Sequence, residues 1–386
     1  MQCPLCNGPA EIVFRRCGQP GSVHMPPGQT VELAIAGCRD CGFFWNVDAF
    51  ADPVAFTALL APAYRAYNLL DNDLHGFPLV DERTRTAKGF LDAHCHWPAL
   101  SYVVEVGSNR GDFLAYLKQC HAHLQLLGVE SSPLSLVGVP TLFNDVHDIH
   151  FSPSFDLVIA RQVLEHMADP LRFLLHLASF VREGGWLLIE VPVLENELAE
   201  GVDPWVVEHV GHYSARALEV LGQRAGLTLV AVEDSYQFSA LFRRAPHPGP
   251  LFTGISNARW EQVRAFLAGV EEQQARWREW AEQGGAICFY GASNVYLAIS
   301  AALRQAWGED FWRDCRLTLV DDSPSRHAEE VGGLRVQSLE SYAPEGKTLY
   351  VVCAMYQYHR QKMVPRVLAR MGPEDRLSAM WTPLPR

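Results

Sequence analysis

Residues 102–115 read Tyr-Val-Val-Glu-Val-Gly-Ser-Asn-Arg-Gly-Asp-Phe-Leu-Ala, and this stretch decides the fold. An apolar run with one acid inside it, Glu105, stops at Gly107. A short turn that includes Gly111 follows, and an amphipathic segment begins at Phe113. This pattern predicts a buried parallel strand that leads into a helix through a turn where a ligand can approach the backbone. The placement of the turn indicates a nucleotide-like ligand.

Further apolar runs alternate with helical patterns along the middle of the chain. Residues 124–130 form a second apolar run that ends in Glu130, and residues 155–160 and 184–192 form later ones. Such alternation predicts an α/β fold with a parallel, doubly wound sheet. In α/β nucleotide sites an acid at the carboxyl end of the second strand binds ribose hydroxyls, and Glu130 stands at that point.

Length and composition limit the class of protein. A chain of 386 residues exceeds what one hydrophobic core usually supports, so we expect two or three domains. The formal charge is −12 and no basic stripe is present, which argues against a nucleic-acid partner. The first residues lack a secretory signal, and no apolar run is long enough to cross a membrane. We expect a cytoplasmic enzyme, a monomer or homodimer, that acts on a small molecule.

Two cysteine pairs near the amino terminus share one spacing. Cys3 and Cys6 form one C-x-x-C pair, and Cys38 and Cys41 form another. Two such turns supply four thiolates in the tetrahedral set that suits zinc, and a site with four protein ligands is structural rather than catalytic. A redox or disulfide role is the alternative. Cys17 lies outside both pairs and is expected to be a spare thiol.

The central motifs together resemble class I S-adenosylmethionine-dependent methyltransferases. A dinucleotide fold opens with G-x-G-x-x-G, whereas this chain has only Gly107 and Gly111, spaced G-x-x-x-G. The resemblance covers about 100 contiguous residues in the motif order of that family. It implies a set of cofactor-binding residues: Glu105, Gly107, Ser108, Asn109, Gly111 and Phe113 at the first turn, Glu130 at the ribose, Asp145 and Val146 at the adenine, and Arg161 and Gln162 facing the sulfonium.

The layout of the whole chain is similar to the three-domain sugar C-methyltransferases, which act on nucleotide-linked keto-deoxysugars. That resemblance implies a zinc-binding domain (1–62), a methyltransferase domain (63–248) and a carboxyl-terminal Rossmann-like domain (249–386) that binds the nucleotide-linked substrate. A strand-turn-helix start at 284–294, a strand ending in two acids at 316–324 and a strand at 347–354 fit the third domain. Between the second and third domains, residues 260–280 have the spacing of a long amphipathic helix.

The catalytic segment of that family reads approximately Y-H-E-H-x-x-Y-F-S, and residues 206–214 here read Val-Val-Glu-His-Val-Gly-His-Tyr-Ser. The resemblance implies that Glu208 and His209 assist removal of a proton beside a ketone, and that the resulting enolate takes the methyl group. It also places Tyr64 in the active site. Val206 replaces a family tyrosine, and residues 238–244 replace a Gly-Gly-Ser-x-Arg stretch, so the sugar acceptor is less certain than the methyl donor.

Several other interpretations stay open. The acceptor could be another natural-product intermediate methylated on oxygen or nitrogen, or the chain could be a binding protein that retains the fold. An oxidoreductase that uses the carboxyl-terminal domain is disfavoured, because residues 284–293 lack G-x-G-x-x-G. His166 is expected to be a structural residue, and His212 could share the pocket of His209.

Overall fold

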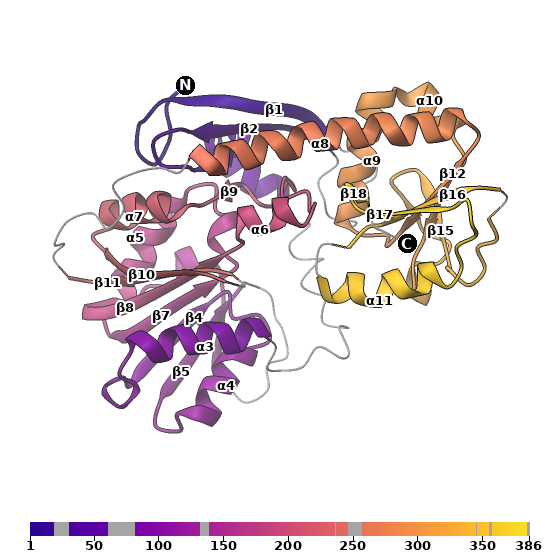
Figure 1. The fold of residues 1–386 in the computed structure, drawn as a ribbon. Helices are drawn as coiled ribbons and strands as arrows, with labels where there is room; N and C mark the ends of the chain where they lie inside the picture. Colours follow the sequence, from indigo (N-terminus) through magenta and orange to yellow (C-terminus); the bar gives the residue numbers. More distant parts are fainter. Residues whose placement is uncertain are drawn as a thin grey trace. The chain divides into compact units, whose positions relative to one another are not determined.

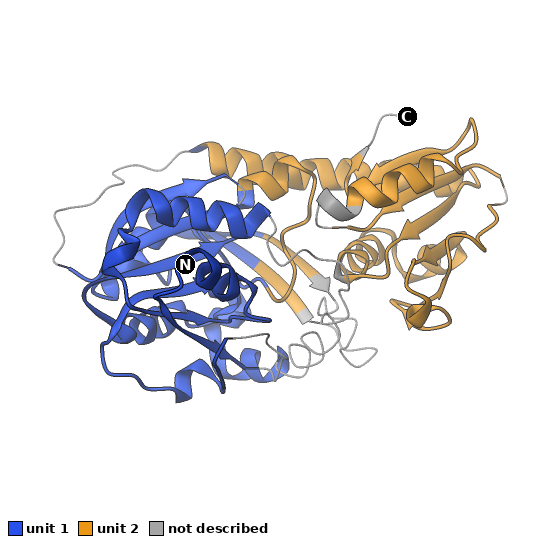
Figure 2. Cartoon of the chain, turned by 90° about the horizontal axis from the view of Figure 1, so that it is seen from below, with its two compact units in different colours: residues 1–13, 35–194, 209–257 blue, residues 14–34, 195–208, 258–386 orange. Residues whose placement is uncertain are grey.

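The computed structural model describes most of the chain, and these residues fall into two compact units (Figure 2). Unit 1 comprises residues 1–13, 35–194 and 209–257, and unit 2 comprises residues 14–34, 195–208 and 258–386. The described residues are 1–18, 31–60, 82–131, 139–235, 237–245, 257–344, 346–354 and 357–383. Tyr64 lies outside them.

A small sheet carries the residues that follow the first cysteine pair. Its strand order is β1-β2-β3-β9, with β1 at Ala10–Gly18, β2 at Val31–Cys38, β3 at Phe44–Asn46 and β9 at Gly211–His212. Residues 11–14 and 31–36 thus lie within the first two of these strands. The fourth strand comes from a segment about 165 residues further along the chain, and it joins the small sheet to the main body of unit 1.

Seven strands form the central sheet of unit 1 in the order β6-β5-β4-β7-β8-β11-β10 (Figure 1). Neighbours from β6 to β8 run parallel, whereas β11 is antiparallel to β8 and to β10. The strand order reverses beside β4, and in such sheets ligands bind outside the carboxyl ends of the strands at that point. The strands are β4 (Tyr102–Val106), β5 (Gln125–Glu130), β6 (Thr141–Phe143), β7 (Phe155–Arg161), β8 (Val181–Val191), β10 (Thr228–Asp234) and β11 (Phe238–Arg243).

Helices cover both faces of this sheet. Alternate residues of its strands point to opposite sides, and both sets are mainly apolar and must be buried. Val104 and Val158 belong to one hydrophobic core with residues of α5 and α7, whereas Val103 and Leu157 belong to another with residues of α3 and α4. The expected α/β fold is confirmed, but the sheet is mixed rather than parallel throughout, because β11 and β10 join it as an antiparallel pair. The helical elements of unit 1 are α1 (Val47–Ala51), α3 (Glu82–His94), α4 (Asp112–Cys120), α5 (Pro170–Phe180) and α7 (Ala215–Arg224), with short 3-10 turns η2 (Trp97–Ala99), η3 (Val146–Asp148) and η4 (Leu164–His166).

Unit 2 has its own sheet, with the order β14-β15-β13-β12-β16-β17-β18. The five strands from β15 to β17 are parallel, and β14 and β18 are antiparallel at the two edges. The strands are β12 (Ala286–Tyr290), β13 (Leu317–Val320), β14 (Glu330–Val331), β15 (Leu334–Gln337), β16 (Thr348–Val352), β17 (Arg376–Ala379) and β18 (Thr382–Pro383). The helices are α6 (Leu194–Ala199), α8 (Asn257–Glu282), α9 (Asn294–Trp307), α10 (Glu309–Asp314) and α11 (Gln357–Leu368), with the turn η5 (Pro324–Arg326).

The parallel strands of unit 2 repeat the order of the first five strands of unit 1, so the Rossmann-like pattern expected near the carboxyl terminus is observed. The long helix expected at residues 260–280 is α8. A buried ion pair also holds unit 2 together: Arg16 donates to Asp203 at 2.5 and 3.3 Å, and Asp203 also accepts from the indole nitrogen of Trp381 (3.4 Å).

None of the helices in the described part of the chain has the length and apolar character needed to cross a membrane.

Candidate active site

The turn after β4 is closed against the end of β5. The backbone amides of Gly107 and Ser108 both donate to the carbonyl of Val129, at 2.9 and 3.2 Å. The next amide, that of Asn109, donates to Glu130 Oε2 at 2.9 Å. Gly107 has a φ of +71°, and a Cβ added to it would lie 2.4 Å from a methyl carbon of Val163. Only glycine therefore fits at this point of the turn.

Glu130 lies where the sequence predicted it, at the carboxyl end of the second strand. Its side chain is buried, and its Oε1 accepts from the backbone amide of Ser131 at 2.8 Å. Asp145 follows the third strand at the same edge of the sheet, where it is exposed and its side chain caps η3. Val146 is half-buried within η3. The structure thus brings these three predicted residues to one edge with the first turn.

Glu105 is a buried acid inside the central sheet. Its Oε2 makes no hydrogen bond to any residue that the structure describes, and its Oε1 lies 3.9 Å from Arg161. Burial raises the pKa of Glu105 to about 8, against the opposing effect of the nearby Arg161 cation. The hydroxyl oxygen of Ser108 is likewise buried without a hydrogen-bond partner in the described part of the chain. Two polar atoms in and beside the turn are therefore available to groups that the described part of the chain does not supply.

Arg161 and Gln162 end β7 and are bound to their neighbours. The Arg161 guanidinium donates to Glu190 and lies 4.3 Å from the ring centroid of Phe113. Gln162 has a φ of +55° and donates from its side-chain amide to Gln237 Oε1 at 2.8 Å. A non-glycine residue in this conformation is strained, and such strain is common at functional sites. Phe113 itself is buried in the core with α3 and α4, where it packs beneath Arg161.

His209 lies beside the end of β7. Its ring centroid is 5.0 Å from that of His166 in η4 and 6.4 Å from that of His212 in β9. The Nδ1 atom of His209 is buried and has no hydrogen-bond partner among the described residues. Burial, with the neighbouring His166 and His212, places the pKa of His209 well below its ordinary value. Its imidazole is therefore neutral at physiological pH and offers a nitrogen lone pair.

Glu208 and Tyr213 flank the same histidine in the sequence. The Glu208 carboxyl is buried, and this burial raises its pKa to about 7. Tyr213 is also buried, and its hydroxyl donates to the carbonyl of Leu164 at 3.4 Å. Burial and the nearby Glu165 raise the pKa of Tyr213 well above its ordinary value, so the phenol stays neutral. Val206, at the position of the family tyrosine, is buried.

The two cysteine pairs converge. The Sγ atoms of Cys3 and Cys41 are 3.6 Å apart, those of Cys6 and Cys38 are 3.4 Å apart, and all four lie within 4.8 Å of one another. Because the thiols hydrogen-bond one another, the pKa of Cys38 lies well below its ordinary value and those of Cys3 and Cys41 lie above theirs. Four thiols at this separation match the tetrahedral set that zinc prefers.

The turn of each pair has the geometry of a metal-binding knuckle. The backbone amide of Gly8 donates to Cys6 Sγ at 3.4 Å, and the amide of Asp40 donates to Cys38 Sγ at 3.3 Å. Such bonds stabilise thiolate charge. The knuckles also dock on α7, since the Arg224 side chain donates to the carbonyls of Pro4 and Leu5 at 2.8 Å.

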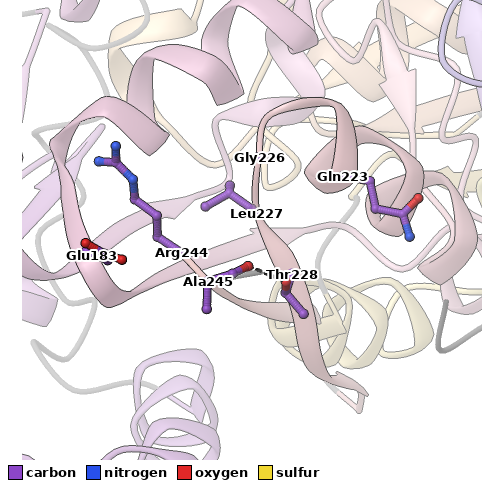
Figure 3. A pocket seen from close by; sticks show the side chains of 7 residues that line it. All are labelled: Glu183, Gln223, Gly226, Leu227, Thr228, Arg244 and Ala245. Atoms are coloured by element: carbon purple, nitrogen blue, oxygen red, sulfur yellow. Dashed lines mark hydrogen bonds between the residues drawn. The ribbon is translucent and has the colours of Figure 1, made fainter. Parts of the chain in front are cut away.

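A pocket of about 440 Å³ lies at the other edge of the central sheet (Figure 3). It is formed where β8 begins, where β10 begins and where β11 ends, so it faces away from the carboxyl ends of β4, β5 and β7. None of the predicted site residues lines it. Its lining residues are Glu183, Gln223, Gly226, Leu227, Thr228, Arg244 and Ala245.

The sequence from residue 79 to 232 matches the family model described as "Methyltransferase domain". The same residues contain the sheet with the turn at Gly107 and the acid Glu130. Residues 79–232 thus carry a methyltransferase domain. The chain is therefore an enzyme of the methyltransferase class. No curated protein sequence matches the chain.

Solved structures similar to this chain include methyltransferases with different acceptors. A 1,6-didemethyltoxoflavin-N1-methyltransferase of Burkholderia thailandensis, bound to S-adenosylhomocysteine, shares 16% identity over 55% of this chain and 96% of its own, with a TM-score of 0.41. A magnesium protoporphyrin IX methyltransferase of Synechocystis, bound to the same product, shares 15% identity over 47% of this chain and 98% of its own, with a TM-score of 0.37. These acceptors are those of the two similar enzymes and are not assigned to this chain.

One residue of the methyltransferase site escaped the sequence motifs. Glu165 is buried in η4, and it offers an oxygen within 4.8 Å of ligand atoms of His166 and His209. The sequence did contain a signal for this residue, since Glu165 and His166 form a Glu-His pair shortly after β7. Only the fold shows that His209, 43 residues later, joins that pair.

Proposed function

We propose that the chain transfers the methyl group of S-adenosylmethionine to a carbon of a nucleotide-linked keto-deoxysugar, or of a related biosynthetic intermediate. The reaction proceeds through an enolate whose formation His209 and Glu208 assist. The proposal rests on one observation above all: the buried Nδ1 of His209 has no hydrogen-bond partner among the described residues, and its ring lies beside that of His166 in η4. The three-part division of the chain at residues 62 and 248 belongs to the same proposal.

The donor half of the site fits the residues named from the sequence. S-adenosylmethionine supplies an electrophilic methyl group, an ammonium group and two ribose hydroxyls. Glu105 Oε2 is buried without a partner in the described part of the chain, and the ammonium group is a partner that fits it. Glu130 would hold the ribose hydroxyls, and the glycine turn would let the cofactor approach the backbone. Asp145 and Val146 would flank the adenine.

We assign Arg161 and Gln162 a smaller role than the sequence resemblance implied, because both side chains are hydrogen-bonded to other residues of the protein. The Arg161 guanidinium donates to Glu190, which also accepts from Ser239 at 2.9 Å. These bonds fix the position of the guanidinium, so that it lines the site with positive charge. Gln162 is held by Gln237. We infer that both residues shape the region that faces the sulfonium and leave methyl transfer itself to the acceptor and His209.

The acceptor half needs a group that assists enolate formation. Loss of a proton from the carbon beside the ketone places negative charge on the oxygen, and the carbon then attacks the methyl group as the sulfur departs as a thioether. A nitrogen lone pair held in a water-poor site can assist by taking the proton or by holding a cation beside the oxygen. His209 offers such a lone pair, with Glu208 next to it in the chain.

Zinc at Cys3, Cys6, Cys38 and Cys41 has a structural role in this proposal. Four thiolates leave no open coordination position for chemistry. The metal would instead fix the knuckles, and through them the strand β3, which pairs with β9 next to His209.

Hydrogen exchange tests the enolate without methyl transfer. The enzyme is mixed with S-adenosylhomocysteine and a nucleotide-linked keto-deoxysugar in deuterated water, and NMR follows deuterium at the carbon beside the ketone. Wild type should catalyse the exchange, His209→Ala should lose it, and His150→Ala, a change at an exposed histidine of unit 1, should keep it. Methylation of an acceptor on oxygen or nitrogen, with no exchange, would overturn the carbon acceptor but not the methyl transfer.

A further inference from the structure

A second group of metal-ligating side chains lies apart from the four cysteines. Glu165 and His166 stand in η4, after β7, and His209 stands before β9. One ligand atom from each of the three lies within 4.8 Å of the other two. All three residues belong to unit 1, so the fold of that unit alone brings them together.

The surroundings of this group favour a bound cation. Glu165 is 1% exposed, and its Oε1 lies 3.9 Å from Nε2 of His166. Nδ1 of His209 is buried without a hydrogen bond to the described residues, and a buried polar atom left in that state destabilises the fold. A ligand that accepts the lone pair of this nitrogen removes that destabilisation.

We propose that Glu165, His166 and His209 bind one divalent transition-metal cation, distinct from the metal at the cysteines. Two imidazoles and one carboxylate suit zinc, cobalt or ferrous iron, and three protein ligands leave coordination positions open. Metal–nitrogen and metal–oxygen bonds are about 2.0–2.2 Å long, which puts the ligand atoms of a tetrahedral site about 3.3–3.6 Å apart. Separations of up to 4.8 Å therefore need to close by at most about 1.5 Å. His166, with 23% of its side chain exposed, can make such a movement.

The open coordination positions of the cation could bind the acceptor. A ketone oxygen bound there would be polarised, and the negative charge of its enolate would be stabilised by the metal. His209 then assists the reaction as a ligand, and its substitution removes the cation. This use rests on the proposed function, but the cation site itself does not, because its residues and their separations are independent of the acceptor.

Zinc stoichiometry tests the site in the absence of cofactor and acceptor. The full-length chain is dialysed to equilibrium against micromolar free zinc, and bound zinc per chain is measured by elemental analysis. Wild type should hold two zinc ions. His166→Ala, His209→Ala and Glu165→Gln should each hold one, and Cys38→Ser should also hold one. His150→Ala, which alters an exposed histidine outside the group, should hold two.

The two sites can be told apart by a cobalt spectrum. In protein loaded with cobalt, Cys38→Ser should lose the intense thiolate-to-metal absorption, whereas His209→Ala should keep it and lose only the second equivalent. A wild-type chain that holds a single zinc ion, or a His209→Ala chain that still holds two, would overturn the proposal. His166→Ala keeps the test decisive if a buried variant does not fold, because 23% of the His166 side chain is exposed.

Discussion

The backbone of Phe44 pairs with that of His212, and this pairing joins the cysteine knuckles to the segment that carries His209. A second bond supports it, since the amide of Asn46 donates to the carbonyl of Val210 at 2.9 Å. The ring of Phe43 lies 4.9 Å from that of Tyr213, which packs the two segments together. The position of His209 thus depends on the fold of the first 46 residues.

Removal of the metal from the cysteines should therefore impair methyl transfer more than cofactor binding. In Cys38→Ser we expect loss of one zinc ion and a fall in turnover of about tenfold or more, because a small displacement of His209 disturbs its alignment with the acceptor. The affinity for S-adenosylmethionine should change by less than about threefold, since none of the residues assigned to the cofactor lies in β3 or β9. Elemental analysis, turnover and calorimetric titration measure the three effects.

Cys120→Ser is the matched control for that variant, because Cys120 is an exposed free thiol in α4. It should keep wild-type metal content and turnover. A Cys38→Ser enzyme with wild-type turnover would show that β9 keeps its place without the metal, and the structural role of the knuckles would then be wrong.

Burial of Glu105 predicts a pH dependence of stability. Its pKa is raised from 4.5 to about 8, so between these values the folded chain holds a proton that the unfolded chain releases. The free energy of unfolding should therefore fall as pH rises through this window, by at most about 1.4 kcal/mol per pH unit from this group. In Glu105→Gln the fall should be smaller, and the melting temperature of the variant should rise relative to wild type from pH 5.5 to 8.

The same variant tests the cofactor assignment. Without a carboxylate for the ammonium group, Glu105→Gln should bind S-adenosylmethionine about tenfold or more weakly, which calorimetry measures. Glu183→Gln, a change at an exposed acid, should leave both the pH slope and the affinity as in wild type. Equal pH slopes in Glu105→Gln and wild type would show that Glu105 is ionised in the folded chain.

The first turn and the strand ends were predictable because their signals are local. A run of apolar residues, a glycine that needs a positive φ and an acid at the end of the next strand can all be seen in short windows around Glu105, Gly107 and Glu130. Parallel strands then bring these residues to one edge, whatever the details of packing. The doubly wound fold follows from the same alternation of runs.

The partners of these residues were not predictable, because they depend on pairing between distant strands. Arg161 was expected to face the sulfonium, and its guanidinium donates to Glu190 on β8, which also accepts from Ser239 on β11, in a network that only the strand order creates. The group of Glu165, His166 and His209 has the same origin. Tyr64 lies outside the described residues, and its catalytic role stays a prediction.

Substitutions of His209 and of the nearby Tyr213 should distinguish a catalytic side chain from one that only packs. His209→Ala should lower turnover by about 10²–10⁴-fold with little change in cofactor affinity, since it removes a group that acts on the acceptor. Tyr213→Phe should keep turnover within about threefold, because its hydroxyl donates to the Leu164 carbonyl at 3.4 Å and stays neutral. Steady-state kinetics measure both. An inert His209→Ala would favour an oxygen or nitrogen acceptor that needs no such help.

A glycine in unit 2 should be intolerant of any side chain. Gly201 has a φ of +68°, and a Cβ added to it would lie 1.6 Å from Thr382 Oγ1. Gly201→Ala should lower the free energy of unfolding by about 2–4 kcal/mol, from backbone strain and overpacking together. Gly284→Ala, which has a φ of +76° but open space around it, should lose only the strain, about 1 kcal/mol. Gly269→Ala, inside the exposed part of α8, should gain about 0.5–1 kcal/mol. Denaturant unfolding of the three variants gives the order, and equal losses at Gly201 and Gly284 would show that Thr382 moves aside without cost.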